Sequence, residues 1–381
     1  MGIDIGSATT RVVVGEFLKG ETNPKIIGVG EALTLGVRDG YIVDTTLASN
    51  SIREAVAMAE KTSGMKIRRA FIAVGGVTLH TDQSAGVAIV SKADGEVTNT
   101  DIKNAIQDCE NNLNLTNKKV IHVSPSSFRL DGKEVLGRLE GMHGTKLEAK
   151  ALFITCSIQH FEDLIEAVSM AGIEPIDIIA APIAGSAIAL SEKQKIVGSA
   201  LVNIGAQTSS LAVFDNGDLV SLQTFSIGSE EITNDIALGL KIPLQNAENL
   251  KFGSETESFS KKKLEEIIEA RLCDIFESIE NHLRKIKRAG LLPAGVIFIG
   301  GGANTPGLIQ VSKSALNLPS AIGTTEIFGN VKTKLRDPSW FTALGLLVSD
   351  TEEGAYPRNS FGGIFKALKI TIKSSIKQLM P

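Results

Sequence analysis

Residues that build metal, redox and disulfide sites are scarce in this sequence. Its 381 residues include three cysteines and five histidines, and neither type shows a metal-binding or redox spacing. The lack of paired or clustered cysteines excludes a disulfide-stapled scaffold and is typical of a reducing cytosol. With no HExxH or comparable cluster, we interpret the histidines as ordinary structural residues rather than zinc ligands.

Long apolar runs and an excess of basic residues are also missing. No stretch approaches the roughly eighteen apolar residues that a transmembrane helix needs, and the N-terminus lacks the basic segment of a signal peptide. A formal net charge of −4 argues against a nucleic-acid-binding protein, whose footprint would be basic. We therefore expect a cytoplasmic protein, and a length of 381 residues predicts two or more domains.

The sequence does contain an internal repeat. "GIDIGSATTRVVVG" at residues 2–15 and "VNIGAQTSSLAVF" at residues 202–214 each place two apolar stretches around an Ile-Gly pair and small hydroxyl residues. We predict two strand-turn-strand hairpins, in which Gly6 and Gly205 allow backbone N–H groups to point at a phosphate. Hydroxyl donors would come from Ser7, Thr9, Thr10, Thr208 and Ser209.

The two copies differ in charge, and a third glycine run follows them. Asp4 could hold a water of a phosphate-bound Mg²⁺, whereas the second copy has Asn203 at this place. The run "FIGGGANTPG" at residues 298–307 follows a predicted strand, and its glycines would let a flat base and ribose approach the backbone. One such loop is usually only a turn. Three of them in this order on a duplicated α/β frame indicate a nucleotide clamp.

The rest of the chain mostly alternates between helices and strands. We predict strands at 68–76, 151–157 and 175–181, and helices at 46–63, 158–171, 232–240 and 261–289, the last with a single packed face. Between about Thr81 and Lys150 the pattern changes to short strands around one helix at 99–114. This change predicts a small inserted α+β unit.

The C-terminal residues differ from the rest. Residues 350–363 have the glycine, proline and charge of a linker, and residues 364–381 predict an amphipathic helix. Its apolar arc contains Ile364, Phe365, Leu368, Ile372, Ile376 and Leu379, and a neighbouring arc contains Lys366, Lys369, Lys373 and Lys377. Such a helix can lie in a membrane interface with its lysines toward anionic headgroups. The alternative is a helix docked on the protein's own body.

The three glycine runs resemble those of the superfamily of actin, heat-shock chaperone and sugar-kinase ATPases. A closer resemblance, to the bacterial cell-division FtsA family, covers nearly the whole chain. It is carried by "GVRDGYIVD" after the first hairpins, "GMHGTKLEAKALFIT" at the exit from the insert, "ITNDIALGLKIPLQNAENLKFG" after the second phosphate loop and "LPAGVIFIGGGANTPG" at the adenosine motif.

The resemblance implies an α/β fold of the actin-like two-lobed ATPase type, with an inserted small α+β subdomain of the SHS2 kind and a C-terminal amphipathic helix. The implied parts are subdomain IA (1–80 and 151–185), inserted subdomain IC (81–150), subdomain IIA (186–226 and 291–349), subdomain IIB (227–290), a linker (350–363) and a membrane-targeting helix (364–381).

The resemblance also implies an ATP-binding protein that polymerises on the inner face of the cytoplasmic membrane at the division site. There it would tether the ring of the tubulin homologue FtsZ and meet other division proteins.

The resemblance also assigns residues to each ligand. ATP and Mg²⁺ would be held by Asp4 (through water), Gly6, Ser7, Ala8, Thr9, Gly205, Ala206, Gln207, Thr208, Gly228, Glu248, Gly300, Gly301, Gly302 and Ala303. The membrane would be contacted by Phe365, Leu368, Ile372, Ile376, Lys366, Lys369 and Lys373. The C-terminal peptide of FtsZ, which usually mixes acidic and apolar residues, would meet Arg271.

Two departures from the family pattern concern catalysis. The family's second phosphate loop usually reads Asp-Ile-Gly-Gly-Gly-Thr-Thr-Asp, and here residues 203–210 read Asn-Ile-Gly-Ala-Gln-Thr-Ser-Ser. Ala181 also precedes Pro182 where many superfamily ATPases have Glu. Because both carboxylates are missing, we expect no catalytic residue and at most very slow ATP hydrolysis. The alternatives are a pilus-assembly actin homologue and a small-molecule kinase, and the basic amphipathic tail argues against both.

Overall fold

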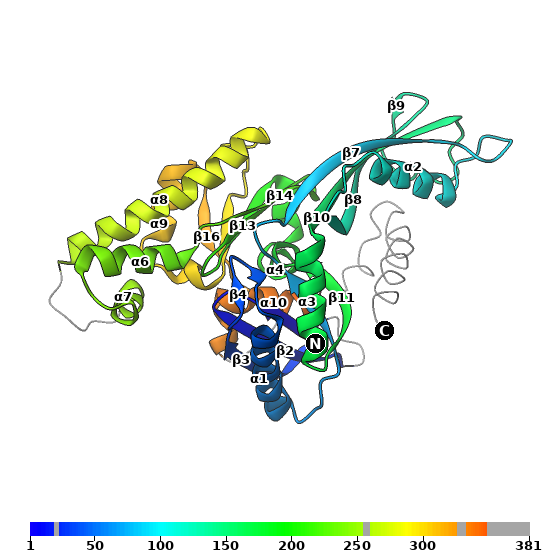
Figure 1. The fold of residues 1–381 in the computed structure, drawn as a ribbon. Helices are drawn as coiled ribbons and strands as arrows, with labels where there is room; N and C mark the ends of the chain where they lie inside the picture. Colours follow the sequence, from blue (N-terminus) through cyan, green and yellow to red (C-terminus); the bar gives the residue numbers. More distant parts are fainter. Residues whose placement is uncertain (19–22, 254–259, 326–332, 349–381) are drawn as a thin grey trace. The chain divides into compact units, whose positions relative to one another are not determined.

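The computed structural model describes residues 1–18, 23–253, 260–325 and 333–348 (Figure 1). These residues form two compact units, one from Met1–His80 and Gln159–Val348 and the other from Thr81–Ile158. The expected linker and the expected membrane helix at 364–381 lie outside the described residues. In the four described ranges, no helix combines the length and the apolar character needed to cross a bilayer.

The larger unit contains two sheets built on the same plan. One has the strand order β11-β6-β1-β2-β3, and the other includes the order β16-β15-β12-β13-β14. In each, a central strand pairs antiparallel with the next strand in sequence and parallel with a distant one: β1 with β2 and β6, and β12 with β13 and β15. The predicted duplication of the hairpin is therefore confirmed. The bounds are β1 Gly2–Ile5, β2 Thr9–Glu16, β3 Lys25–Leu33, β6 Arg69–Val74, β11 Glu174–Ala180, β12 Ser199–Ile204, β13 Ser209–Asp215, β14 Asp218–Phe225, β15 Val296–Ile299 and β16 Ser320–Ile322.

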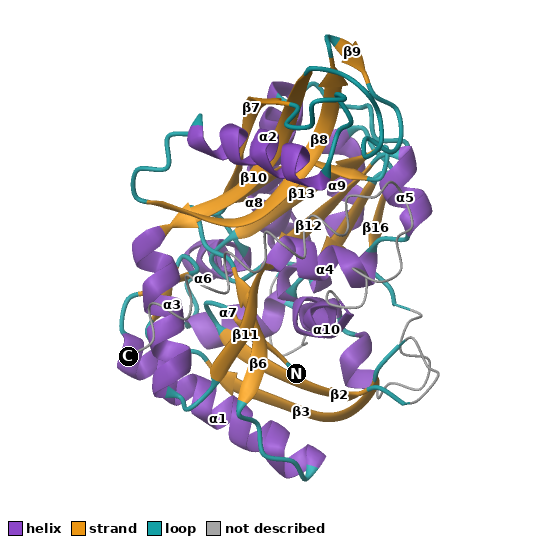
Figure 2. Cartoon of the chain, turned by 90° about the vertical axis from the view of Figure 1, so that its right-hand side faces the viewer, coloured by secondary structure: helices purple, strands orange, loops and turns teal. Residues whose placement is uncertain are grey.

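Two helices lie between these sheets (Figure 2). α4 (Ala181–Ala189) packs on the second sheet, and α10 (Phe341–Val348) packs on the first sheet and against α4. All eight residues of α10, FTALGLLV, are buried, and Thr342 is the one polar residue among them. The shared core includes Val13, Leu201, Phe214, Trp340 and Leu344. Burying an aliphatic or Phe side chain of this kind stabilises a fold by roughly 1.5–3 kcal/mol.

Five other helices, α1 and α6 to α9, cover the outer faces of the two sheets. α1 (Thr45–Ser63) packs on β3, begins after the capping side chain of Asp44, and ends at Gly64 with a φ of 72°. The second sheet is covered by α6 (Ser229–Leu240), α7 (Leu244–Lys251), α8 (Lys261–Lys285) and α9 (Leu308–Leu316). Two further helices are α3 (Ile158–Met170) and α5 (Glu192–Val197).

The long helix α8 buries one face, as its periodicity predicts. The buried residues are Ile268, Leu272, Ile275, Phe276, Ile279 and Leu283, which pack in the same core as β12 and β13. The expected end of this helix at Ala289 is wrong, because α8 ends at Lys285. Lys287 has a φ of 58°, a left-handed conformation that a helix cannot continue through.

The second unit is a sheet with one helix packed on it. Its strand order is β7-β10-β8-β9, and α2 (Asn99–Asn111) packs on β10 around a core that contains Ile102, Ile106, Phe128 and Phe153. The strands are β7 His80–Ile89, β8 Lys118–Leu130, β9 Lys133–Glu134 and β10 Lys146–Ser157. The inserted α+β unit is thus confirmed, but the expectation of short strands is wrong: β7, β8 and β10 have 10, 13 and 12 residues. β10 also continues through position 150, where the expected boundary of the insert lies.

Candidate functional site

The two hairpins of the larger unit end in turns of the same form, called here the first turn (residues 6–9) and the second turn (residues 205–208). In each, the glycine N–H donates to the carbonyl of a threonine three residues later, Gly6 to Thr9 at 3.2 Å and Gly205 to Thr208 at 2.8 Å. The glycine N–H groups are therefore used by the turns themselves. Five N–H groups near them donate no hydrogen bond within the described part of the chain: those of Ser7, Ala8, Ala206, Gln207 and Thr208. Unbonded N–H groups on successive turn residues are suitable donors for a phosphate.

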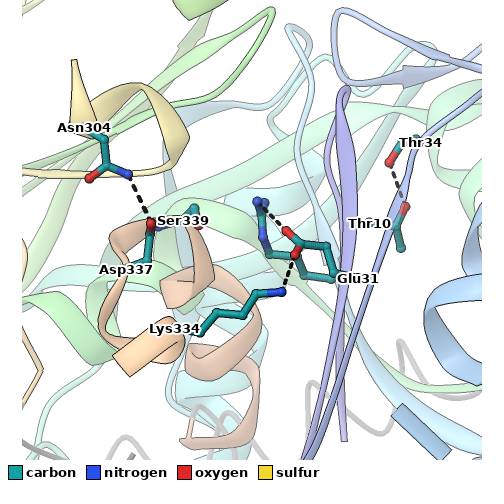
Figure 3. Close-up of polar contacts among 8 residues, drawn as sticks. Thr10, Glu31, Thr34, Asn304, Lys334, Asp337 and Ser339 are labelled. Atoms are coloured by element: carbon teal, nitrogen blue, oxygen red, sulfur yellow. Dashed lines mark hydrogen bonds and ion pairs between the residues drawn. The ribbon is translucent and has the colours of Figure 1, made fainter. Parts of the chain in front are cut away.

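The hydroxyl groups near the turns fall into two classes. Ser7, Thr9 and Thr208 are partly exposed on the turns, but Thr10 and Ser209 are fully buried. The Thr10 hydroxyl forms a 2.8 Å hydrogen bond with the Thr34 hydroxyl inside the protein (Figure 3). The expectation that Thr10 and Ser209 donate to a phosphate is therefore wrong, because both are the first inward-facing residues of their strands.

Asp4 lies in β1 directly opposite Arg11 of β2. Burial raises the pKa of Asp4 to about 6, and the charge of Arg11 acts in the opposite direction. Arg11 forms an ion pair with Glu31 at 3.0 Å, and Lys334 also donates to Glu31 at 2.6 Å (Figure 3). The Asp4 carboxylate accepts no hydrogen bond from the described residues. A desolvated carboxylate without a donor suits a water bound to a hard cation, so Asp4 fits Mg²⁺.

The third glycine run lies against the end of β12. A Cβ at Gly300 would sit 2.3 Å from Asn203 Oδ1, so only glycine permits this approach. Gly302 and Ala303 face the core, whereas a Cβ at Gly301 would meet no atom within 4 Å. The short helix that follows, η1 (Gly301–Asn304), is held through Asn304, which donates to Asp337 at 3.3 Å (Figure 3). Position 301 is therefore open on the side where a side chain would lie.

The start of α6 is also joined to the second turn. Ser229 N–H donates to the Gly205 carbonyl at 2.9 Å, and Glu230 N–H donates to the Ala206 carbonyl at 2.7 Å. A Cβ at Gly228 would lie 2.3 Å from the Ala206 carbonyl oxygen. The structure therefore brings Gly228 directly against the second turn. The positive end of the α6 dipole lies at the same place, where it favours an anion.

Glu248 of α7 reaches this region through a residue that the sequence analysis missed, Lys251. Lys251 is buried and donates to the Ser229 carbonyl at 3.1 Å, to Thr233 Oγ1 at 2.8 Å and to Glu248 Oε2 at 2.7 Å. Glu248 is also hydrogen-bonded to Thr233. Desolvation lowers the pKa of Lys251, and Glu248 acts in the opposite direction. The signal was its spacing, because Lys251 follows the buried Ala247 by one helical turn and so lies on the inner face of α7.

The first and second turns both accept a hydrogen bond from a third turn, Asp39–Gly40. β4 (Val37–Arg38) and β5 (Tyr41–Ile42) are joined by the turn Asp39–Gly40. Asp39 N–H donates to Gln207 Oε1 at 2.8 Å, and Gly40 N–H donates to Ser7 Oγ at 3.1 Å. Ser7 and Gln207 therefore lie against neighbouring residues of the same turn. In the sequence, only the motif "GVRDGYIVD" drew attention to this segment.

Three other residues singled out in the sequence have clear surroundings. Ala181 is the first residue of α4, and Asn203 lies beside Gly300. Because these residues are alanine and asparagine, neither position presents a carboxylate. Arg271 of α8 already forms a bidentate pair with Asp235 of α6, at 2.7 and 3.1 Å, and a second pair with Asp274 at 3.2 Å. An incoming carboxylate would have to share Arg271 with these two.

Comparison with known proteins agrees with this architecture. The family model described as "Cell division protein FtsA" matches residues 200–345, and the model described as "SHS2 domain inserted in FTSA" matches residues 76–155. The cell division protein FtsA of Bacillus subtilis is 31% identical to this chain over 369 residues, which cover 91% of this chain and 82% of that protein.

Two solved structures share the fold. The PilM-PilN type IV pilus biogenesis complex matches with a TM-score of 0.69 at 16% identity, covering 93% of this chain and 98% of the matched one. MreB5 of Spiroplasma citri bound to ADP matches with a TM-score of 0.53 at 14% identity, covering 92% and 95%. At these identities the likeness establishes an actin-like α/β fold and nothing more. The family match goes further: the chain belongs to the FtsA family of cell-division proteins.

Proposed function

We propose that this protein binds ATP with Mg²⁺ between the first turn, the second turn and the glycine run at 300–302. The observation that carries the proposal is the pair of equivalent turns with unbonded N–H groups at Ser7, Ala8, Ala206 and Gln207. Glu248 and the open side of Gly301 would meet the ribose and the base. The bound ADP of the MreB5 neighbour supports a nucleotide in this fold.

The chain's own residues would bind the nucleotide without hydrolysing it efficiently. When bound, Mg²⁺ would neutralise phosphate charge, and Asp4 would hold it through a water. Asn203 and Ala181 offer no carboxylate to orient an attacking water. Turnover should therefore stay well below the ordinary enzymatic rate of about 1 per second or more.

We further propose that the protein polymerises on the inner face of the cytoplasmic membrane and tethers the FtsZ ring there. Its membership of the FtsA family and the amphipathic pattern of residues 364–381 support this role. A single tail with four lysines, each contributing about 1 kcal/mol, would bind only modestly. A polymer that presents many tails would bind far more tightly, because later tails insert at a high effective concentration.

Sedimentation with anionic vesicles tests the membrane role. The full chain should bind vesicles, more strongly with ATP and more weakly at high salt, because the lysine contribution is screened. Deletion of residues 361–381 should abolish binding. Phe365→Glu and Leu368→Glu should do the same by placing a charge in the apolar arc, whereas Lys369→Gln should only weaken it. If the truncated protein sediments with vesicles as well as the full chain does, the tail is not the anchor.

Arg271 is proposed to meet the C-terminal peptide of FtsZ in the region 227–290. Its guanidinium has five N–H donors, so it can hold Asp235 and still pair with a peptide carboxylate while its stem packs on apolar residues. Arg271→Glu should weaken peptide binding by on the order of 1–3 kcal/mol and leave ATP and vesicle binding unchanged. Asp235→Asn is the matched control, because it breaks the same helix–helix ion pair and keeps the cation. Equal peptide affinities for wild type and Arg271→Glu would move the site elsewhere, and no binding by either would refute the tether role.

A further inference from the structure

The turn Asp39–Gly40 exposes two N–H groups that its own hairpin does not use. Both residues have positive φ, 52° at Asp39 and 75° at Gly40, as in a two-residue hairpin turn of type I′. The strand pairing joins Arg38 to Tyr41 and Val37 to Ile42, so the N–H groups of the two turn residues remain at the tip. Such groups need acceptors when they are partly buried.

The first turn and the second turn each supply one of these acceptors. The second turn contributes Gln207 Oε1 to Asp39, and the first turn contributes Ser7 Oγ to Gly40. The Gln207 amide nitrogen donates to no described residue, so it remains available to a ligand. The Gln207 amide oxygen thus accepts a hydrogen bond from Asp39, while the amide nitrogen has no partner among the described residues.

The turn Asp39–Gly40 is firmly attached to the part of the unit built on the first sheet. A Cβ at Gly40 would lie 2.5 Å from Gly76 Cα, so the two backbones touch. The Tyr41 ring packs edge-on against His160 with centroids 4.8 Å apart, and His160 Nε2 lies 3.1 Å from the Gly75 carbonyl oxygen. The bond from Asp39 to Gln207 therefore connects a hairpin that packs against the end of β6 to the turn between β12 and β13.

We infer that the Gln207 side chain is a latch that positions the two phosphate turns before the nucleotide binds and slows its release afterwards. This inference rests on the proposed function and specifies how the same site is regulated.

Hydrogen exchange of the full-length protein without nucleotide tests whether the latch forms. In Gln207→Ala, the Asp39 amide loses its acceptor and should exchange about five- to tenfold faster, in line with one neutral hydrogen bond. Gln207→Glu keeps an oxygen acceptor at the same reach, so the Asp39 amide should stay protected. Gln223→Ala is the control: this glutamine of β14 donates to the Thr224 carbonyl at 3.0 Å, and its removal should leave Asp39 unchanged.

Release of a fluorescent ATP analogue, chased with unlabelled ATP, tests whether the latch controls the nucleotide. Gln207→Ala should release the analogue several-fold faster than wild type and Gln223→Ala. Gln207→Glu should bind it more weakly although its Asp39 amide is protected, because a carboxylate then stands beside the phosphates.

Two results would overturn the inference: unchanged exchange at Asp39 in Gln207→Ala, or faster exchange there with unchanged release of the analogue. If wild type binds no nucleotide, the proposed function fails and the role in release fails with it. That failure is distinguishable, because the exchange at Asp39 is measured without nucleotide.

Discussion

The first and second hairpins share a backbone and differ in charge. In the same register, Asp4 faces Arg11 in the first hairpin, and Asn203 faces Ser210 in the second. Both turns nevertheless close with the same bond from glycine N–H to threonine carbonyl. The turn with its unbonded N–H groups is therefore a backbone feature that needs no charged side chain. We propose that the Asp4 carboxylate serves a hydrated cation, and that Arg11 faces it as a counter-charge.

The residue opposite each position differs between the two hairpins. Asp4 and Asn203 are both half-buried, but Arg11 faces Asp4 and Ser210 faces Asn203. A carboxylate at position 203 would lie beside Gly300 and Ile204 with no arginine opposite it. Burying an unpaired charge is costly, whereas a neutral amide is tolerated. We therefore propose the second hairpin as a phosphate site only and the first as the site of the metal.

The largest effect should come from removing the support of the second turn. Lys251→Met keeps most of the side-chain volume but removes the donor that joins the start of α6 to α7. Ser229 and Thr233 lose their buried partner, so the free energy of unfolding should fall by on the order of 2–4 kcal/mol. ATP affinity should fall too, while the first turn and its bond to Gly40 remain. Urea unfolding and ATP titration measure both effects, and Lys285→Met on the exposed end of α8 is the control. An unchanged ATP affinity of Lys251→Met would show that the start of α6 does not contribute to ATP binding.

A smaller effect should follow from making the first hairpin resemble the second. Asp4→Asn removes a desolvated carboxylate, so the protein without nucleotide should gain stability at pH 7, by on the order of 1–3 kcal/mol. The sign follows from the raised pKa: the folded state binds the Asp4 proton more tightly than the unfolded chain does. The wild type therefore loses stability relative to Asp4→Asn as pH rises from about 4 to about 6. Urea unfolding of both proteins across this range checks the slope, and a difference that does not change with pH would contradict the assignment.

The backbone of both hairpins could be predicted because it depends on local pattern. Apolar alternation on either side of an Ile-Gly pair specifies two strands and a tight turn at Gly6 and again at Gly205. The packed face of α8 was predictable for the same reason, since helical periodicity identifies the buried side. The strands of the insert were underestimated because one face is polar, as in β7, and sequence pattern alone does not show where pairing stops.

The side-chain contacts of the site could not be predicted, because they join distant segments. Nothing near Gln207 indicates that Asp39, 168 positions away, will donate to it. Thr10 was expected on the turn, but strand alternation turns it inward to Thr34. Lys251 was overlooked because lysine is rarely fully buried, and only its three acceptors make the position tolerable.

We propose that the first hairpin binds the metal and that the second binds only phosphate. Calorimetric titration of ATP with Mg²⁺ and with EDTA, for wild type, Asp4→Ala and Asn203→Ala, separates these two roles. Wild type and Asn203→Ala should each bind ATP at least about tenfold more tightly with Mg²⁺, a difference of about 1.4 kcal/mol. Asp4→Ala should bind equally in both conditions. Retention of the full Mg²⁺ effect by Asp4→Ala, or its loss in Asn203→Ala, would contradict this assignment of the metal.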